Sequence, residues 1–181
     1  LANVAHQRGE VTEARRRYEE ALDACLQHDN RRGQGAILKA LGDLAWQTTG
    51  PRAAMEFLEA SLRTFNQIFD RQSSAVAQYS IAFMHRQVGR VDEAARYYSD
   101  SLALRQQTKD RRGEGFVRKA IGDVRRRTAG SGPGRELTEA TRAQVRADMK
   151  EARAQLRRAM ALSREVGDQR NLAVALKALG D

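Results

Sequence analysis

Cysteine and long apolar runs are almost absent from this sequence. Cys25 is the only cysteine, so an internal disulfide is impossible. No apolar run is long enough to span a membrane or to serve as a signal peptide. These absences argue against a disulfide-stapled secreted protein and against a membrane-spanning one. They predict a cytoplasmic protein with no membrane partner.

Aromatic residues and lysine are also scarce. Aromatics make up 6% of the chain and hydrophobic residues 41%, so the core must consist mostly of Ala, Leu, Val and Ile, a mixture that favours closely packed helices. Lysine supplies five of the 32 basic residues and arginine the other 27, with a formal net charge of +9. That charge permits contact with nucleic acid or anionic membranes, although a solvated helix face accounts for it equally well.

The chain repeats itself every 40 residues. The pentapeptide KALGD occurs at 39–43 and 177–181, with KAIGD at 119–123. Apolar residues within each 40-residue row recur in steps of three and four, as in Ala14, Tyr18, Ala21 and Leu22, which is helical spacing. No stretch alternates apolar and polar residues between hairpin turns. Each row therefore predicts two helices and no strand.

Turn residues divide the rows. Gly9, Gly50 with Pro51, and Gly89 separate the two helices of a row, and the pattern D/N-R-[RQ]-[GS] separates one row from the next. The rows are 1–29, 30–69, 70–109, 110–168 and a truncated 169–181, forming one array over 1–181. The expected helices are Leu1–Gln7, Thr12–Gln27, Gln34–Gln47, Arg52–Ile68, Ser74–Gln87, Val91–Thr108, Glu114–Thr128, about Glu136–Val166, and Leu172 onward.

The fourth row contains an insertion near 130–147. Its first part, AGSGPGRE at 129–136, is predicted to be a loop, and the rest a polar helix that lengthens the second helix of the row to roughly thirty residues. The chain starts at Leu1 rather than Met and stops inside a repeated pattern. We therefore expect it to be a piece of a longer polypeptide.

The repeated columns resemble those of the tetratricopeptide repeat. That pattern has a large and then a small residue in the first helix, and small, large and small residues in the second. The matching positions are Leu1, Ala2, Ala14, Tyr18 and Ala21; Leu41, Gly42, Ala54, Leu58 and Ser61; Ile81, Ala82, Ala94, Tyr98 and Ser101; and Ile121, Gly122, Ala152, Leu156 and Ala159. The 40-residue period, with turns such as DNRRGQG at 29–35, resembles a variant found in Pins-type adaptors, kinesin light chains and the sensor arrays of bacterial STAND and SARP-type regulators.

The resemblance implies a right-handed α-solenoid of helix-turn-helix repeats whose concave groove holds a protein or peptide. It implies a non-catalytic sensor or scaffold module, without a cofactor, in a larger cytosolic signalling or transcription regulator. The Arg-rich composition favours a bacterial one. In a STAND-type parent, groove occupancy would bias an ATPase switch in other domains of the same polypeptide.

Carried over residue by residue, the resemblance also predicts which side chains line the groove. These residues are Asn3, His6, Lys39, Asp43, Trp46, Tyr79, Phe83, Arg86, Lys119, Asp123 and Arg126, with Ala36, Val76, Phe116, Lys177 and Asp181 beside them. Asp43 and Asp123 stand where Asn is frequent in the Pins-type variant, which predicts a groove of alternating charge.

Each group of groove residues has a second interpretation. An exposed ion pair within one helix explains Lys39 and Asp43 equally well. Tyr79 and Phe83 beside Arg86 have the composition of a binding hot spot, and burial against the next row is the alternative.

Other chemistry finds little support in the sequence. GSGPGR at 130–135 lacks the Lys-Ser/Thr ending and the preceding strand of a phosphate loop. Cys25 and His28 have no third group, and His6, His28 and His85 lack metal-ligand spacing. We expect no catalytic residue, metal or cofactor.

Two other functions stay open for the array. One is nucleic-acid binding through the Arg-rich turns and the long fourth-row helix, and the other is a homo-oligomerisation scaffold, with oligomeric state unknown. In the turns, the Arg31–Arg32 and Arg111–Arg112 pairs are expected to meet the carbonyl ends of the preceding helices.

Overall fold

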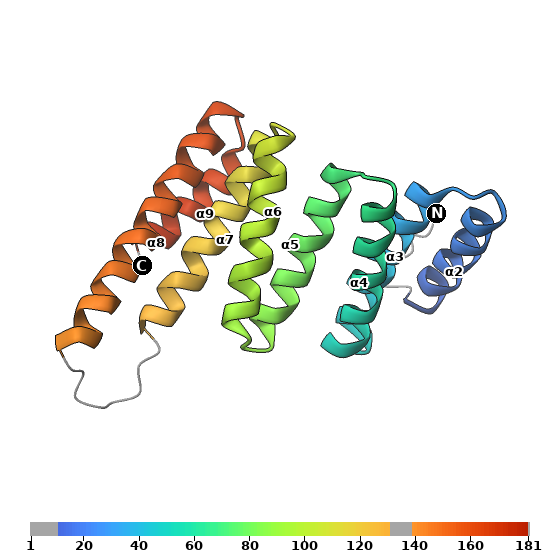
Figure 1. Cartoon of the computed structure of the whole chain (residues 1–181), viewed down its shortest axis with the longest axis horizontal. Helices are drawn as coiled ribbons and strands as arrows, with labels where there is room; N and C mark the ends of the chain where they lie inside the picture. The colour runs from blue at the N-terminus through green and yellow to red at the C-terminus, as the bar shows by residue number, and fades with distance from the viewer. Residues whose placement is uncertain (1–10, 131–138, 181) are drawn as a thin grey trace. The chain divides into compact units, whose positions relative to one another are not determined.

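The computed structural model describes residues 11–130 and 139–180. Regular structure in these ranges is α-helical throughout, as predicted (Figure 1). The helices are α2 Val11–Gln27, α3 Arg31–Thr48, α4 Pro51–Gln67, α5 Arg71–Gln87, α6 Val91–Gln107, α7 Arg111–Gly130, α8 Glu139–Glu165 and α9 Gln169–Gly180. They form two compact units, one containing α2 to α5 and the other α6 to α9. The predicted helix Leu1–Gln7 and the site residues Asn3, His6 and Asp181 lie outside the described residues.

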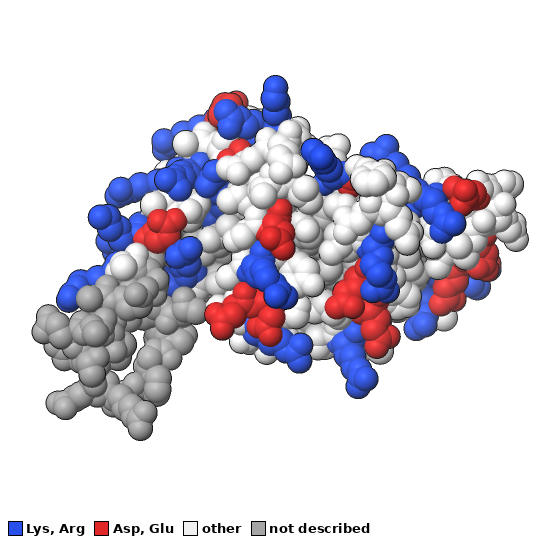
Figure 2. Space-filling view, in the orientation of Figure 1, with Lys and Arg blue, Asp and Glu red and all other residues white. Residues whose placement is uncertain are grey.

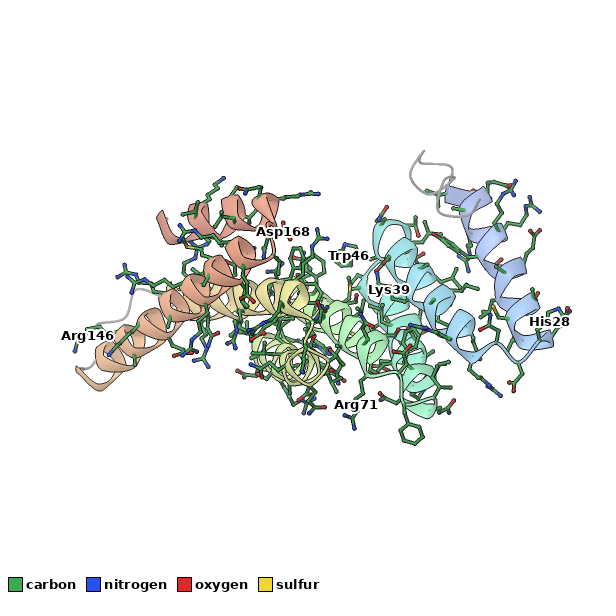
Figure 3. All side chains as sticks on the ribbon, turned by 90° about the horizontal axis from the view of Figure 1, so that it is seen from above. His28, Lys39, Trp46, Arg71, Arg146 and Asp168 are labelled. Atoms are coloured by element: carbon green, nitrogen blue, oxygen red, sulfur yellow. The ribbon has the colours of Figure 1, made fainter. Side chains whose placement is uncertain are left out.

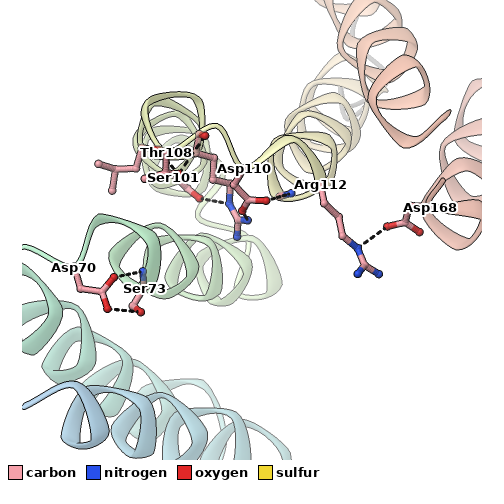
Figure 4. A network of polar contacts seen from close by, with 10 residues as sticks. Asp70, Ser73, Ser101, Thr108, Asp110, Arg112 and Asp168 are labelled. Carbon is pink, nitrogen blue, oxygen red and sulfur yellow. Dashed lines mark hydrogen bonds and ion pairs between the residues drawn. The ribbon is translucent and has the colours of Figure 1, made fainter. Parts of the chain in front are cut away.

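The first helix of the second to fifth rows begins earlier than predicted. The sequence analysis placed these starts at Gln34, Ser74, Glu114 and Leu172, whereas the helices begin three residues sooner. The reason is side-chain capping. The Asn30 side chain accepts a hydrogen bond from the Gly33 N–H (2.9 Å), and Asp70 accepts one from Ser73 (3.0 Å; Figure 4). The three residues after the capping position, such as R-R-G at 31–33, therefore form the first helical turn instead of a loop.

The turns between rows share one backbone feature, a residue with a positive φ angle. The residue before each cap adopts a left-handed conformation: Asp29 (φ 46°), Phe69 (φ 54°), Lys109 (φ 56°) and Gly167 (φ 69°). In the second of these turns, the Asp70 N–H donates to the Phe65 carbonyl (3.0 Å), which closes the preceding helix. The chain thus reverses within two or three residues and brings successive helices side by side.

The small residues of the first unit allow its helices to pack closely. A Cβ placed on Gly42 would lie 2.8 Å from the Leu58 Cγ, and one on Gly35 would lie 2.6 Å from the Phe65 ring. The buried Ser61 hydroxyl donates to the Gly35 carbonyl at 2.7 Å. Gly35 and Gly42 therefore allow the close contact of α3 with α4, although glycine disfavours a helix by about 1 kcal/mol relative to alanine.

The second unit repeats this packing with different residues. Ala94 and Tyr98 of α6, and Ala152 and Leu156 of α8, are at most 1% exposed, like Ala54 and Leu58 in the first unit. A Cβ on Gly122 would lie 2.9 Å from the Leu156 Cγ. The small and large columns identified in the sequence are therefore packing positions.

The insertion lengthens two helices. α7 continues through Gly130, two residues beyond the predicted end at Thr128, and α8 spans 27 residues where roughly thirty were predicted. Residues 131–138, which hold most of the predicted loop, lie outside the described residues.

Candidate functional site

The first unit contains a pocket of about 370 Å³ between α3 and α5. Its lining residues are Asp43, Trp46 and Gln47 of α3 and Tyr79, Ser80, Phe83 and Met84 of α5. Both helices contribute side chains spaced three or four residues apart, because such residues share one face of a helix. Four of the predicted groove residues therefore meet in one pocket: Asp43, Trp46, Tyr79 and Phe83.

Aromatic side chains form the apolar part of the pocket. The rings of Trp46 and Phe83 meet edge to face, with centroids 6.3 Å apart and planes inclined by 84°. Trp46, Tyr79 and Phe83 are each partly buried. Packing therefore holds these rings in place, and part of each ring surface stays open to a ligand. For Tyr79 and Phe83 this arrangement is intermediate between an exposed binding hot spot and full burial against the next row.

Arg86 places a positive charge beside this aromatic surface. Its guanidinium carbon lies 4.9 Å from the centroid of the Phe83 ring, within cation–π range. Its Nε is buried and has no hydrogen-bond partner, and no carboxylate of the described residues pairs with Arg86. A buried guanidinium N–H is costly to leave unsatisfied. This side chain can therefore accept an anionic group from a ligand.

Lys39 and Asp43 pair with each other on α3. The Lys39 Nζ lies 2.5 Å from the Asp43 Oδ2, so the intrahelical ion pair anticipated as an alternative is formed. Both residues belong to the helix that carries Trp46 (Figure 3). Burial, and then the Asp43 carboxylate, raise the pKa of the Tyr18 hydroxyl. Asp43 thus contributes negative charge to one end of the pocket while Lys39 partly compensates it.

The predicted residues of the second unit form their own cluster. Lys119 pairs with Asp123 at 2.7 Å, and Arg126 donates to the Ala178 carbonyl of α9 at 3.0 Å. Arg112 stacks over the Phe116 ring at 5.9 Å. Arg126 therefore joins α7 to α9, a structural role that the sequence analysis did not anticipate.

The sequence analysis missed three lining residues of the pocket: Gln47, Ser80 and Met84. They follow directly after the predicted residues Trp46, Tyr79 and Phe83. Widening the predicted face of each helix by one position would therefore have included them. Of the flanking residues, Ala36, Val76, Phe116 and Lys177 are exposed on their helices. Ala36, Val76 and Phe116 therefore add exposed apolar surface next to the predicted groove residues.

The arginines of the inter-row turns do not meet helix carbonyls as predicted. Arg31 pairs with Asp29 at 2.8 Å, and Arg32 reaches Asp70 of the following row at 3.1 Å. In the second unit Arg112 reaches Asp168 at 3.0 Å (Figure 4). Arg32 and Arg112 each bind the capping acid of the following inter-row turn, so each ties two neighbouring turns together.

These contacts also shift the titration of the capping acids. Burial by itself raises the pKa of Asp70, but hydrogen bonds from Ser73 and the charge of Arg32 bring it below its ordinary value. The Asn171 N–H and the Arg112 guanidinium lower the pKa of Asp168. Both carboxylates are therefore held in the charged form.

The described residues contain neither a metal-binding cluster nor a membrane-spanning helix. Within residues 11–130 and 139–180, no three His, Cys, Asp or Glu side chains converge in a way that could hold a metal ion. No helix in the described part of the chain has the length and apolar character needed to cross a bilayer.

Comparison with known proteins identifies the repeat. Residues 1–67 match the family description "Tetratricopeptide repeat", and residues 74–108 match a second family of the same description. No curated protein matched the sequence significantly.

Solved structures with the same fold share little sequence with the chain. BtubC (BKLC) from P. vanneervenii superposes with a TM-score of 0.74 at 18% identity, covering 100% of this chain and 71% of the other. A kinesin light chain with nearly identical TPR-like repeats, from Podosopora anserina, gives 0.67 at 17% identity, covering 99% and 84%.

The fold and the repeat can now be assigned together. The predicted fold class, an all-α solenoid of helix-turn-helix repeats, is confirmed by the helix pairs and by these structures. Tetratricopeptide repeats generally mediate protein–protein interaction and generally serve as non-catalytic scaffolds. The chain is built of tetratricopeptide repeats, and its helices α7 to α9 continue the same packing pattern beyond the two matched ranges.

Proposed function

We propose that the pocket between α3 and α5 binds a peptide segment of a partner protein. The bound segment inserts one large apolar side chain against Trp46, Tyr79 and Phe83, and places an acidic group next to Arg86. Lys39 and Asp43 set the position and charge pattern of the segment along α3. In the second unit, Lys119 and Asp123 have the same role for a segment that binds along α7. Binding, without turnover, is the activity of the module.

The observation that carries this proposal is the combination of aromatic surface and unpaired charge. A pocket of about 370 Å³ lies at the lower end of the range of about 300–1,000 Å³ for small ligands, so it suits a side chain better than a cofactor. Trp, Tyr and Arg are also the residues most often found at binding hot spots. The Arg86 Nε has no hydrogen-bond partner among the described residues, and an acceptor on the peptide would supply one, which favours an acidic peptide over a neutral one.

The test uses Trp46, the only tryptophan of the chain, as a fluorescent reporter. Peptides of about 12 residues would be selected from a random phage library on the intact chain and titrated while Trp46 emission is recorded. A hot-spot pair contributes at least about 2 kcal/mol, so a Tyr79→Ala, Phe83→Ala double variant should bind the selected peptides at least about 30-fold more weakly.

A matched control comes from the same unit. Phe69 is 88% exposed in a turn and does not line the pocket, so Phe69→Ala removes an aromatic ring without altering the site. Circular dichroism would check that both variants keep their helices. Undiminished affinity in a folded Tyr79→Ala, Phe83→Ala protein would refute the proposed site.

The wider setting of the module is also a proposal. The 40-residue repeat, the charged turns and the Arg-rich composition support a sensor module in a larger cytoplasmic regulator of the bacterial STAND or SARP type. In such a protein, peptide binding would bias a switch in other domains of the same polypeptide. Isolating the full-length gene product and measuring its ATPase or DNA-binding output with and without a selected peptide would test this setting.

A further inference from the structure

The outward face of α8 carries a line of positive charge. Its members are Arg146, Lys150, Arg153, Arg157 and Arg164, all exposed. Their spacings of four, three, four and seven residues keep them on one narrow face at 3.6 residues per turn. That face is opposite the side on which Ala152, Leu156 and Ala159 are buried. Eighteen residues at 1.5 Å each make this α8 basic stripe about 27 Å long.

No described residue neutralises the charges of the α8 basic stripe. In the described residues none of its five members has a hydrogen bond or ion pair. The two acids of α8 whose side chains are described both have other partners, since Glu151 accepts a hydrogen bond from Gln155 and Glu165 pairs with Arg111 at 3.4 Å. The stripe therefore carries a nearly full positive charge.

Basic residues on α2 show the opposite arrangement. Arg15 pairs with Glu19 at 2.9 Å, while Arg16 and Arg17 both pair with Glu13. Figure 2 shows the same contrast over the surface, with mostly Lys and Arg over α8 and mixed charges over α4 and α6. Figure 3 shows Arg146 extending outward from the N-terminal half of α8. A high arginine content therefore does not by itself explain the stripe.

We propose that the α8 basic stripe binds the phosphate backbone of double-stranded nucleic acid. A linear array of unpaired cations matches a linear polyanion, and four of its five members are Arg, whose planar guanidinium suits phosphate oxygens. Contacts of this kind position a protein on a duplex without reading its sequence. The stripe lies in the second unit and is independent of the proposed peptide pocket in the first.

The composition of the stripe argues against other anionic partners. It contains no aromatic side chain on which the bases of a single strand could stack. It also lacks the aromatic or large apolar anchor that dominates most protein interfaces. In the described part of α8, Leu156 and Leu162 are buried and the helix packs against α7 and α9, so no large apolar side chain is exposed there to insert into a membrane.

The test measures duplex binding as a function of salt. The 181-residue chain would be titrated into a fluorescein-labelled DNA duplex of mixed sequence, about 25 base pairs long, and anisotropy recorded from about 50 to 250 mM KCl. Five phosphate contacts predict a slope of log Kobs against log[KCl] of about −4.5. The variant Arg153→Gln, Arg157→Gln, Arg164→Gln should reduce that slope by about 2.7 and weaken binding more than about tenfold at 100 mM KCl.

The charge-matched control is Arg15→Gln, Arg16→Gln, Arg17→Gln on α2. It removes the same net charge from ion-paired positions, so it should keep the wild-type slope. Circular dichroism would confirm the helix content of both variants. Any of three results would overturn the proposal: no duplex binding at about 50 mM KCl, equal losses in both variants, or α8-dependent binding to single strands or phosphatidylserine vesicles in preference to the duplex.

Discussion

A pair of glycines on α7 tests the packing rule behind the repeat. Gly122 and Gly115 are both buried inside the same helix, so replacing either with alanine brings the same propensity gain of about 1 kcal/mol. At Gly122 the new Cβ would lie 2.9 Å from the Leu156 Cγ and 3.1 Å from the Ala152 carbonyl oxygen. The second contact involves backbone, which cannot rotate away. At Gly115 the nearest atom is the Asn171 side-chain nitrogen, at 3.3 Å.

The two substitutions are therefore expected to differ in their effect on stability. Overpacking against fixed atoms costs about 1–3 kcal/mol, so Gly122→Ala should be net destabilising by about 1 kcal/mol. Gly115→Ala should be close to neutral, because its one tight contact is with the end of a side chain, and the Asn171 amide needs to shift by only a few tenths of an ångström while it keeps its hydrogen bond to the Ser163 hydroxyl. Both substitutions restrict the unfolded chain equally. The difference of about 1–2 kcal/mol between their free energies of unfolding therefore measures the effect of the new contact in the folded protein.

Urea denaturation followed by far-UV circular dichroism measures this difference. With a typical slope of about 2 kcal/mol per molar urea, the two midpoints should differ by about 0.5–1 M. A Gly122→Ala, Leu156→Ala double variant should lose less stability than the sum of the single changes, because the second change removes the atoms that the first one meets. A Gly122→Ala midpoint equal to or above that of Gly115→Ala would refute the close-packing argument.

Three further predictions concern turns, pH and the pocket. Phe69→Gly should stabilise the protein by up to about 1 kcal/mol in thermal unfolding, because the exposed Phe69 adopts a left-handed backbone conformation that glycine tolerates. A lowered melting temperature would contradict this prediction. Folding lowers the pKa values of Asp70, Glu114 and Asp168, so the urea midpoint of unfolding should stay level above about pH 5 and fall as the pH drops below about 4. A midpoint that rises on acidification would contradict this prediction. Arg86→Gln should weaken binding of acidic selected peptides by about 1.5–3 kcal/mol in calorimetry while sparing neutral ones; equal losses for both would exclude a charge-specific role.

The fold was largely predictable because it rests on local and periodic signals. The spacing of Ala14, Tyr18 and their equivalents indicates helices, and the 40-residue period indicates how pairs of helices stack. The first-helix starts were wrong because Asn30 and Asp70 can act either as turn residues or as helix caps. Only the hydrogen bond to the N–H three residues later distinguishes these roles.

The candidate site was predictable in part. Family resemblance and helical spacing selected Trp46, Tyr79 and Phe83, which the structure brings together around one pocket. The role of Arg126 could not be predicted, because its partner is a backbone carbonyl 52 residues away and carries no side-chain signature in the sequence.

The sequence by itself determined the helical class, the repeat length and the positions that must be small, because each of these follows from contacts between residues three, four or 40 apart. Tertiary structure alone decided which charges are paired. The arginines of α2 and of the inter-row turns meet carboxylates, whereas Arg86 and the α8 basic stripe do not. Pairing depends on which side chains meet in space, and two equally Arg-rich segments therefore have different capacities to bind a partner.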